Sequence, residues 1–123
     1  MHKRAPLLVA IGLMAALALA GCAGARRGAA GNEVVIKMMA NNFEVRSLEV
    51  KAGTVVKWVN ADPVDHSVWE GVPDSGNYRF QSPDFGPGGQ YSYTFEQPGT
   101  YPIFCKTGGH YLTGMKMQVV VKK

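Results

Sequence analysis

Cysteine is scarce in this chain of 123 residues, which contains only Cys22 and Cys105. One intramolecular disulfide is therefore the most that the chain can form. Helical periodicity is also missing, because no stretch repeats its apolar residues at a sustained spacing of 3.6. The sequence contains no internal repeat that would indicate a solenoid. These absences direct attention to short strands and to the few residues that carry metal-binding chemistry.

The excess of positive charge is small and lies near the N-terminus. The chain has 13 Lys and Arg against nine Asp and Glu, a formal net charge of +4. From Glu33 onward the basic and acidic residues number nine each, so the surplus comes from Lys3, Arg4, Arg26 and Arg27. A basic face for nucleic acid is therefore not expected. The carboxylates also lack the paired arrangement that acid–base hydrolysis requires.

The first 21 residues have the pattern of a secretory signal. Lys3 and Arg4 form a short basic region, and the uncharged apolar run "APLLVAIGLMAALALAG" follows it. This run is too short for a comfortable membrane span, as is typical of signal sequences. We therefore expect residues 1–21 to be a signal peptide and the mature protein to be exported.

The residues around the expected cleavage point, "LALAGC", resemble the lipobox of bacterial lipoproteins. This resemblance implies that Cys22 becomes the lipid-modified first residue and anchors the protein to a membrane. Ordinary cleavage nearby, with Cys22 lost or free, is the alternative. Residues 22–32 are small and rich in Gly and Ala, so we expect a flexible tether there. The domain itself, residues 33–123, is then expected to face the periplasm or the cell exterior.

From residue 33 onward, apolar and polar residues alternate with a period of two, which is typical of half-buried strands. Short strands, frequent turn signals and no intervening helices predict an all-β domain, either a sandwich or a barrel. The polar segment 71–89 is expected to be a long connection with room for one short helical turn. The expected strands are "EVVIKMM", "TVVKWVN", "YSYTFE", "YPIFC" and "MQVVVK", with two more short strands within "FEVRSLEVKAG".

Three side chains with metal-binding atoms recur at equal spacing in "YPIFCKTGGHYLTGMKM". On a helix, Cys105, His110 and Met115 would scatter around the axis, and on a strand successive members would face opposite sides. Only a folded-back loop brings the three together. The residues that permit such backbone reversals are Gly108, Gly109 and Gly114. If Cys22 carries lipid, Cys105 has no disulfide partner and is free to bind a metal.

A fourth ligand is expected to be His66, the other histidine of the domain segment. A lone histidine is more often structural, but His66 follows a strand and an Asp-Pro turn, as expected for a residue at a strand end. Zinc sites rarely use a thioether, and calcium and magnesium prefer oxygen ligands. Two imidazoles, a thiolate and a weak axial thioether are typical of electron-transfer copper sites. We therefore expect one copper ion bound by His66, Cys105, His110 and Met115.

The stretches "VKWVNADPVDHSV" and "FGPGGQYSYTFEQPGTYPIFC", with the C-x4-H-x4-M ending, resemble the cupredoxins, in particular the plastocyanin, amicyanin and auracyanin group. The resemblance runs from about Val34 to the C-terminus. It implies a Greek-key β-sandwich of seven or eight strands with one type 1 copper near one end. The same ligands, His66, Cys105, His110 and Met115, follow from it.

Three positions depart from the family pattern. Gly108 stands where many members have Pro, which could loosen the ligand loop. Lys106 follows the cysteine where a hydroxyl residue is common, so a hydrogen bond near the metal is expected to be missing or replaced. Met117 stands where Gly is frequent, and we expect it in the core, with Met115 as the axial ligand. These departures concern the reduction potential and the loop rather than the identity of the metal.

The resemblance implies a blue-copper protein that carries single electrons between redox partners outside the cytoplasm. His66 is expected to be buried, and His110 to present its ring edge at the surface. Tyr111 and Leu112 are expected to form a docking patch around His110, with simple loop packing as the alternative. The expected partners are a donor and an acceptor, such as a cytochrome, an oxidase or a reductase, and the expected state is a monomer.

Two other functions remain open at this point. A copper carrier that delivers the metal to another protein could use transient thioether sites at Met38, Met39, Met115 or Met117. A metal-free domain used for adhesion conflicts with intact ligands at all four positions. No enzymatic activity is expected, because multicopper oxidases and copper nitrite reductases need further copper ligands that this chain lacks.

Overall fold

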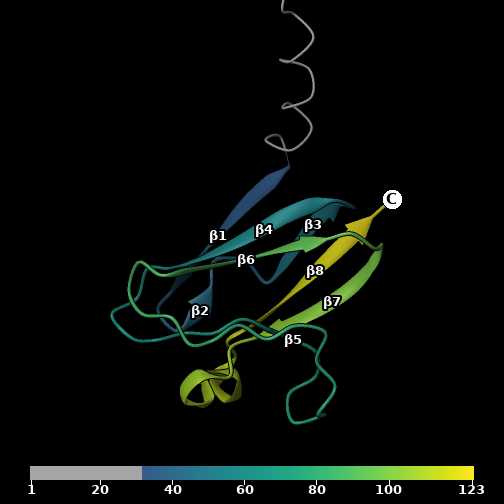
Figure 1. Cartoon of the computed structure of the whole chain (residues 1–123). Helices are drawn as coiled ribbons and strands as arrows, with labels where there is room; N and C mark the ends of the chain where they lie inside the picture. The colour runs from purple at the N-terminus through teal and green to yellow at the C-terminus, as the bar shows by residue number, and fades with distance from the viewer. Residues whose placement is uncertain (1–31) are drawn as a thin grey trace, which may run out of the picture.

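The structure, a computed structural model, describes residues 32–123, and the expected signal peptide and Cys22 lie outside the described residues. Two β-sheets pack face to face, with one short helix at one end (Figure 1). Within residues 32–123, no helix is long and apolar enough to cross a membrane. The elements are β1 (Glu33–Met39), β2 (Asn42–Phe43), β3 (Ser47–Lys51), β4 (Thr54–Asn60), β5 (Trp69–Glu70), β6 (Gln90–Phe95), β7 (Gly99–Phe104), the 3₁₀ helix η2 (Thr107–Thr113) and β8 (Lys116–Lys122).

Each sheet has four strands, in the order β2-β1-β4-β6 in one and β3-β8-β7-β5 in the other. β1 runs parallel to β4 and β3 parallel to β8, whereas the other neighbouring pairs are antiparallel. The chain therefore passes repeatedly from one sheet to the other, as it does in β-sandwiches with Greek-key connections. The expected all-β sandwich, with eight strands, is confirmed.

The alternating residues of each strand build a core between the sheets. In β4, Val56 and Trp58 are completely buried, as the period of two predicts. The Trp58 ring lies 6.4 Å from Phe80, 6.4 Å from Tyr91 and 6.3 Å from Phe95, measured between ring centroids. Aromatic pairs at such distances add to the stabilisation that burial of their apolar area provides. This cluster is part of the core between the two sheets.

One buried polar contact joins the two sheets. The indole Nε1 of Trp58, in β4, donates a hydrogen bond to the sulfur of Met117, in β8, at 3.4 Å. Both side chains are buried. Because its sulfur accepts this bond inside the core, Met117 is a core residue, as expected.

The strand ends that carry the expected ligands lie together at one end of the sandwich (Figure 1). β4 ends at Asn60, six residues before His66, and β7 ends at Phe104, directly before Cys105. β8 begins directly after Met115, and η2 lies at the same end. The start of β1 and the C-terminus lie at the opposite end. The topology thus gathers residues from distant parts of the sequence at one pole.

The connection between β5 and β6 differs from the expectation, because it contains turns but no helix. The short helix lies instead in the ligand loop, as η2. β5 was not among the expected strands, since an element of two residues is too short to show alternation. Isolated β-bridges pair His66 with Phe85 and Trp69 with Gln81. These backbone hydrogen bonds attach the irregular connection between β5 and β6 to the rest of the domain.

We predict that Trp58→Ala lowers the free energy of unfolding of the metal-free protein by about 3–5 kcal/mol, because it leaves a cavity in the aromatic cluster. Val35→Ala is a suitable control, since Val35 is 48% exposed in neighbouring β1. That change should cost less than about 0.5 kcal/mol. Urea denaturation followed by tryptophan fluorescence, which comes from Trp69 alone in Trp58→Ala and from both tryptophans in Val35→Ala, measures both losses. Equal losses for the two variants would contradict the assignment of Trp58 to the centre of the core.

Candidate metal centre

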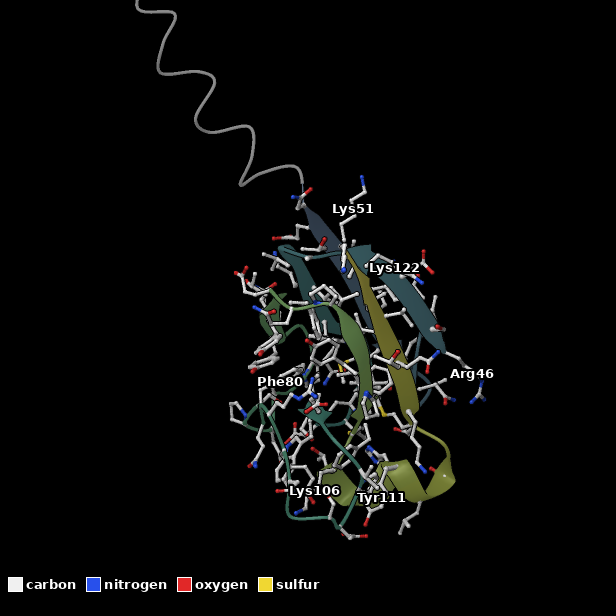
Figure 2. The ribbon with its side chains drawn as sticks, turned by 90° about the vertical axis from the view of Figure 1, so that its right-hand side faces the viewer. Arg46, Lys51, Phe80, Lys106, Tyr111 and Lys122 are labelled. Atoms are coloured by element: carbon white, nitrogen blue, oxygen red, sulfur yellow. The ribbon has the colours of Figure 1, made fainter. Side chains whose placement is uncertain are left out.

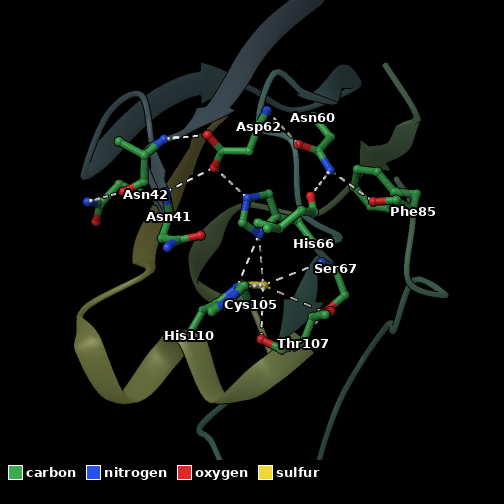
Figure 3. Close-up of polar contacts among 12 residues, drawn as sticks. Asn41, Asn42, Asn60, Asp62, His66, Ser67, Phe85, Cys105, Thr107 and His110 are labelled. Carbon is green, nitrogen blue, oxygen red and sulfur yellow. Dashed lines mark hydrogen bonds and ion pairs between the residues drawn. The ribbon is translucent and has the colours of Figure 1, made fainter. Parts of the chain in front are cut away.

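Three donor atoms meet at the pole of the sandwich (Figure 3). The Nδ1 atoms of His66 and His110 lie 3.2 Å apart. The sulfur of Cys105 lies 3.7 Å from each of these nitrogens. The cysteine carries a free, buried thiol. The structure therefore brings three of the four expected ligands together, with their metal-binding atoms facing one another.

His66 is held rigidly on the buried side of this triangle. Its side chain is completely inaccessible to solvent. Its backbone N–H donates to the carbonyl of Phe85 at 3.1 Å, and its carbonyl accepts from the N–H of Phe85 at 2.8 Å. The other ring nitrogen, Nε2, lies 2.6 Å from the carboxylate of Asp62. Both the backbone and the ring of His66 are thus fixed from the side away from Cys105.

Asp62 is a residue of the site that the sequence did not reveal. In the sequence it stands out only as the aspartate of the Asp-Pro turn before His66. Burial raises the pKa of the Asp62 carboxyl, but hydrogen bonds from His66 and from two backbone N–H groups outweigh it and bring that pKa below its usual range. The sequence pattern that could have indicated this contact is the spacing of four residues between Asp62 and His66. Nothing local in the sequence shows that the turn between them brings the two side chains together.

Cys105 and Met115 are joined through the backbone of the loop between them. The N–H of Cys105 donates to the carbonyl of Met115 at 3.1 Å, and the N–H of Met115 donates to the carbonyl of His110 at 3.2 Å. The N–H of Tyr111 donates back to the carbonyl of Cys105 at 3.1 Å. Met115 is also completely buried. This is the folded-back loop that the spacing predicts, and its backbone bonds place the residue expected to be axial next to the triangle.

Two glycines make the turn inside η2. Gly108 and Gly109 have φ values of +58° and +68°, between two 3₁₀ turns. Proline cannot adopt a positive φ, so a proline at position 108 would be incompatible with this backbone. A Cβ added at Gly108 would lie 3.1 Å from Nε2 of His110. Glycine at 108 therefore allows both the turn and the close approach of the histidine ring.

Ser67 supplies hydrogen bonds on the cysteine side of the site. Its backbone N–H points at the sulfur of Cys105 at 3.4 Å, where it stabilises charge on a thiolate. Its hydroxyl oxygen accepts from the backbone N–H groups of Lys106, at 3.1 Å, and Thr107, at 3.2 Å. Lys106 has no hydroxyl, and its ammonium lies over the ring of Trp69, so the hydroxyl on this side of the site comes from Ser67, on a different loop.

The exposed side of the site carries His110 and its neighbours. His110, in η2, is half-buried, whereas His66 is completely buried. Leu112 is 77% exposed. The hydroxyl of Tyr111 donates to the carboxylate of Asp74, at 3.1 Å from its Oδ2, and this bond raises the pKa of the tyrosine. Tyr111 therefore links η2 to the connection that follows β5, and its ring packs edge-on against Phe104, with ring centroids 5.6 Å apart.

The triangle has the dimensions that a metal ion requires. A point in its plane at about 2.0 Å from both nitrogens lies about 2.1 Å from the sulfur, close to the usual metal–nitrogen and metal–thiolate distances. Two imidazoles and a thiolate in a trigonal arrangement are typical of blue-copper sites. The donor set and its spacing therefore fit one copper ion.

Comparison with known proteins agrees with this geometry. Residues 30–122 match the family described as "Copper binding proteins, plastocyanin/azurin family". The chain belongs to this family. The cupredoxins that it resembles include a plastocyanin of Scenedesmus fuscus, with 34% identity over 100 residues, which covers 73% of this chain and 100% of the relative.

Solved cupredoxin structures share the fold. A methionine-to-alanine variant of amicyanin in its Cu(I) form superposes with a TM-score of 0.62 and 28% identity, over 75% of this chain and 83% of that chain. A copper-containing nitrite reductase from Thermus scotoductus SA-01 matches with a TM-score of 0.62 and 27% identity, over 74% of this chain but 22% of that enzyme. The cofactor of this cupredoxin is copper, and His66, Cys105 and His110 form its candidate site.

We predict that Gly108→Ala weakens Cu(II) binding about tenfold, because the new methyl group displaces the ring of His110. Gly76→Ala is the matched control: Gly76 has a φ of +74°, and its added Cβ meets nothing within 4 Å. Both changes should cost about 1–2 kcal/mol of folding stability, because both force alanine into a left-handed conformation. Competition titration with a copper chelator measures the affinity. Equal weakening in both variants would show that the loss comes from backbone strain alone.

Proposed function

We propose that this cupredoxin is an electron carrier that holds one copper ion with His66, Cys105, His110 and Met115. The observation that carries the proposal is the triangle of two Nδ1 atoms and one sulfur, with sides of 3.2, 3.7 and 3.7 Å. The match to the plastocyanin/azurin family supports it. Copper bound there would supply a one-electron couple, Cu(II)/Cu(I). The soft sulfur ligands suit Cu(I), and the imidazoles also suit Cu(II).

The protein's part is to keep the ligands in one arrangement while an electron moves. His66 is fixed by its backbone pair with Phe85 and by Asp62. Cys105 is fixed by its backbone bond to Met115 and by the N–H of Ser67. A site that both oxidation states tolerate needs little rearrangement, and this favours fast transfer.

Met115 is proposed as the axial ligand in preference to Met117. The sulfur of Met117 accepts a hydrogen bond from Trp58 inside the core, so it is engaged elsewhere. Met115 is completely buried, and its backbone is bonded to both Cys105 and His110. These contacts support the assignment that the equal spacing of Cys105, His110 and Met115 indicated.

Electrons are proposed to enter and leave through His110, with Tyr111 and Leu112 as the docking patch. Of the two histidines, His110 is partly exposed whereas His66 is completely buried, and Leu112, two residues further on, is 77% exposed. A small apolar surface suits brief contact with a redox protein, because such interfaces bury little area. The partner is proposed to be a donor or acceptor protein such as a cytochrome, an oxidase or a reductase, and the carrier to act as a monomer.

The N-terminal end of the domain indicates which side of it a membrane anchor would be attached to. Residues 1–21 are proposed to be the signal peptide, and residues 22–32 a tether that begins at lipidated Cys22, on the outer side of a bacterial cytoplasmic or outer membrane. β1 starts at the end opposite η2 (Figure 1). Lys51 and Lys122 lie at that tether end, whereas Lys106 and Tyr111 lie at the ligand end (Figure 2). An anchor before residue 33 would therefore be attached at the end of the domain opposite η2, which leaves the ligand end free to meet a partner.

The copper-carrier alternative receives less support from the methionines. Met38 is completely buried, and the sulfur of Met117 is bonded to Trp58, which leaves Met39, at 46% exposed, as the accessible member of the set. A catalytic role is likewise not proposed, although the chain resembles part of a nitrite reductase. The match covers 22% of that enzyme, and the ligands described above make one mononuclear site.

The visible spectrum of the copper-loaded protein tests the proposal. We predict an intense thiolate-to-copper band that Cys105→Ser abolishes, because serine cannot supply the thiolate. Met115→Leu should shift this band and raise the reduction potential, whereas Met117→Leu, which alters only the core, should leave both nearly unchanged. A colourless, tightly bound Cu(I) form that resists oxidation would support the carrier instead. A larger effect from Met117→Leu than from Met115→Leu would overturn the axial assignment.

We further predict that Leu112→Gln slows electron self-exchange about tenfold, because two molecules must meet through their His110 faces; this corresponds to about 1.4 kcal/mol. Val35→Gln, a similar change on an exposed strand away from η2, is the control and should have little effect. Line broadening in mixtures of reduced and oxidised protein measures the rate. An unchanged rate in Leu112→Gln would remove this residue from the docking patch.

A further inference from the structure

We infer that Asp62 is the positioning residue of the copper site: it selects the nitrogen that His66 presents to the metal and stabilises the more highly charged Cu(II). This inference rests on the proposed function. Asp62 does not belong to the ligand set, and it touches the site only through the far side of the His66 ring (Figure 3).

The carboxylate of Asp62 is enclosed by donors. Its Oδ2 lies 2.6 Å from Nε2 of His66 and accepts the backbone N–H of Asn41 at 2.9 Å. Its Oδ1 accepts the backbone N–H of Ala40 at 2.6 Å. The residue is 9% exposed. Charged hydrogen bonds of this kind are stronger than neutral ones, so the carboxylate is held firmly in one position.

The turn between β1 and β2 is shaped to hold this carboxylate. Ala40 and Asn41 are consecutive and have φ values of +54° and +53°, a left-handed conformation that is unfavourable for alanine. This conformation lets both N–H groups point at Asp62. The hydrogen bonds to the carboxylate offset the cost of the strained turn. The β1–β2 turn thus belongs to the support of His66, although it is far from that residue in sequence.

The contact decides the protonation pattern of the ring. An ionised carboxylate can only accept hydrogen bonds, so Nε2 of His66 must carry the proton. The lone pair of the neutral ring is then on Nδ1, the atom that faces Cys105 and His110. A carboxylate on the far nitrogen also makes the ring a stronger electron donor to a metal. Within residues 32–123, His66 is the one histidine with such a carboxylate contact.

The same carboxylate acts on the charge of the site. It carries a negative charge one imidazole ring away from the metal, in surroundings that are largely shielded from water, where charges interact strongly. Cu(II) bears one more positive charge than Cu(I), so Asp62 stabilises the oxidised state more than the reduced one. The reduction potential is therefore lower than it would be with a neutral residue at this position.

Asp62→Asn tests both parts, with Asp65→Asn as the matched control. Asp65 is an exposed carboxylate next to His66 in sequence, and its removal changes the net charge equally without removing the contact to the ring. We expect Asp62→Asn to favour Cu(I) over Cu(II) by at least tenfold, which corresponds to a potential about 59 mV higher. Asp65→Asn should change this ratio by less than about twofold. Redox titration of the copper-loaded full chain measures it.

The tautomer of His66 is a second readout that needs no copper. In the metal-free wild type, nitrogen NMR should show the proton of His66 on Nε2, and in Asp62→Asn this preference should weaken or reverse. A wild-type proton on Nδ1 would overturn the inference, as would equal potential shifts in the two variants. The wild-type measurement stands even if Asp62→Asn does not fold. A wild type that bound no copper would instead reject the proposed function, which the spectrum tests separately.

Discussion

The site depends on a single constraint: a thiol and two imidazoles, carried by different loops, must be held within hydrogen-bonding distance of one another. His66 belongs to the connection between the two sheets, whereas Cys105 and His110 belong to the turn between β7 and β8. Their separation is therefore set by how the sheets pack, and the buried Trp58 contributes to that packing, because its indole N–H donates to the sulfur of Met117 in the opposite sheet. A loosened core would move the ligands relative to one another before it changed any ligand itself.

The two histidines of the site differ in burial and in how they are held. His66 is inaccessible, paired through its backbone with Phe85 and through its ring with Asp62. His110 is partly accessible and lies on a glycine-containing turn, beside an exposed Leu112. A rigid buried ligand sets the geometry and the charge around the metal, and an accessible one can lie close to a partner. This asymmetry agrees with a protein that exchanges electrons rather than one that binds a substrate.

The departures from the family pattern have local physical reasons. Gly108 suits a positive φ that proline cannot adopt, and it leaves room for the ring of His110. Ser67 organises the backbone of Lys106 and Thr107, so a hydroxyl directly after the cysteine is not required. Met117 uses its sulfur to satisfy the indole of Trp58. Each unusual residue thus fits its own surroundings in the fold.

The strands and the metal-binding loop could be predicted from the sequence alone. Alternation with a period of two indicated the strands, and the equal spacing of Cys105, His110 and Met115 indicated a folded-back metal-binding loop, because both are local patterns. Only the tertiary structure showed the short strand β5, the helix in the ligand loop, and the contact of Asp62 with His66. The reason is physical: a hydrogen bond between side chains depends on where two turns end in space, and the left-handed Ala40 and Asn41 that complete the carboxylate's surroundings leave no periodic trace in the sequence.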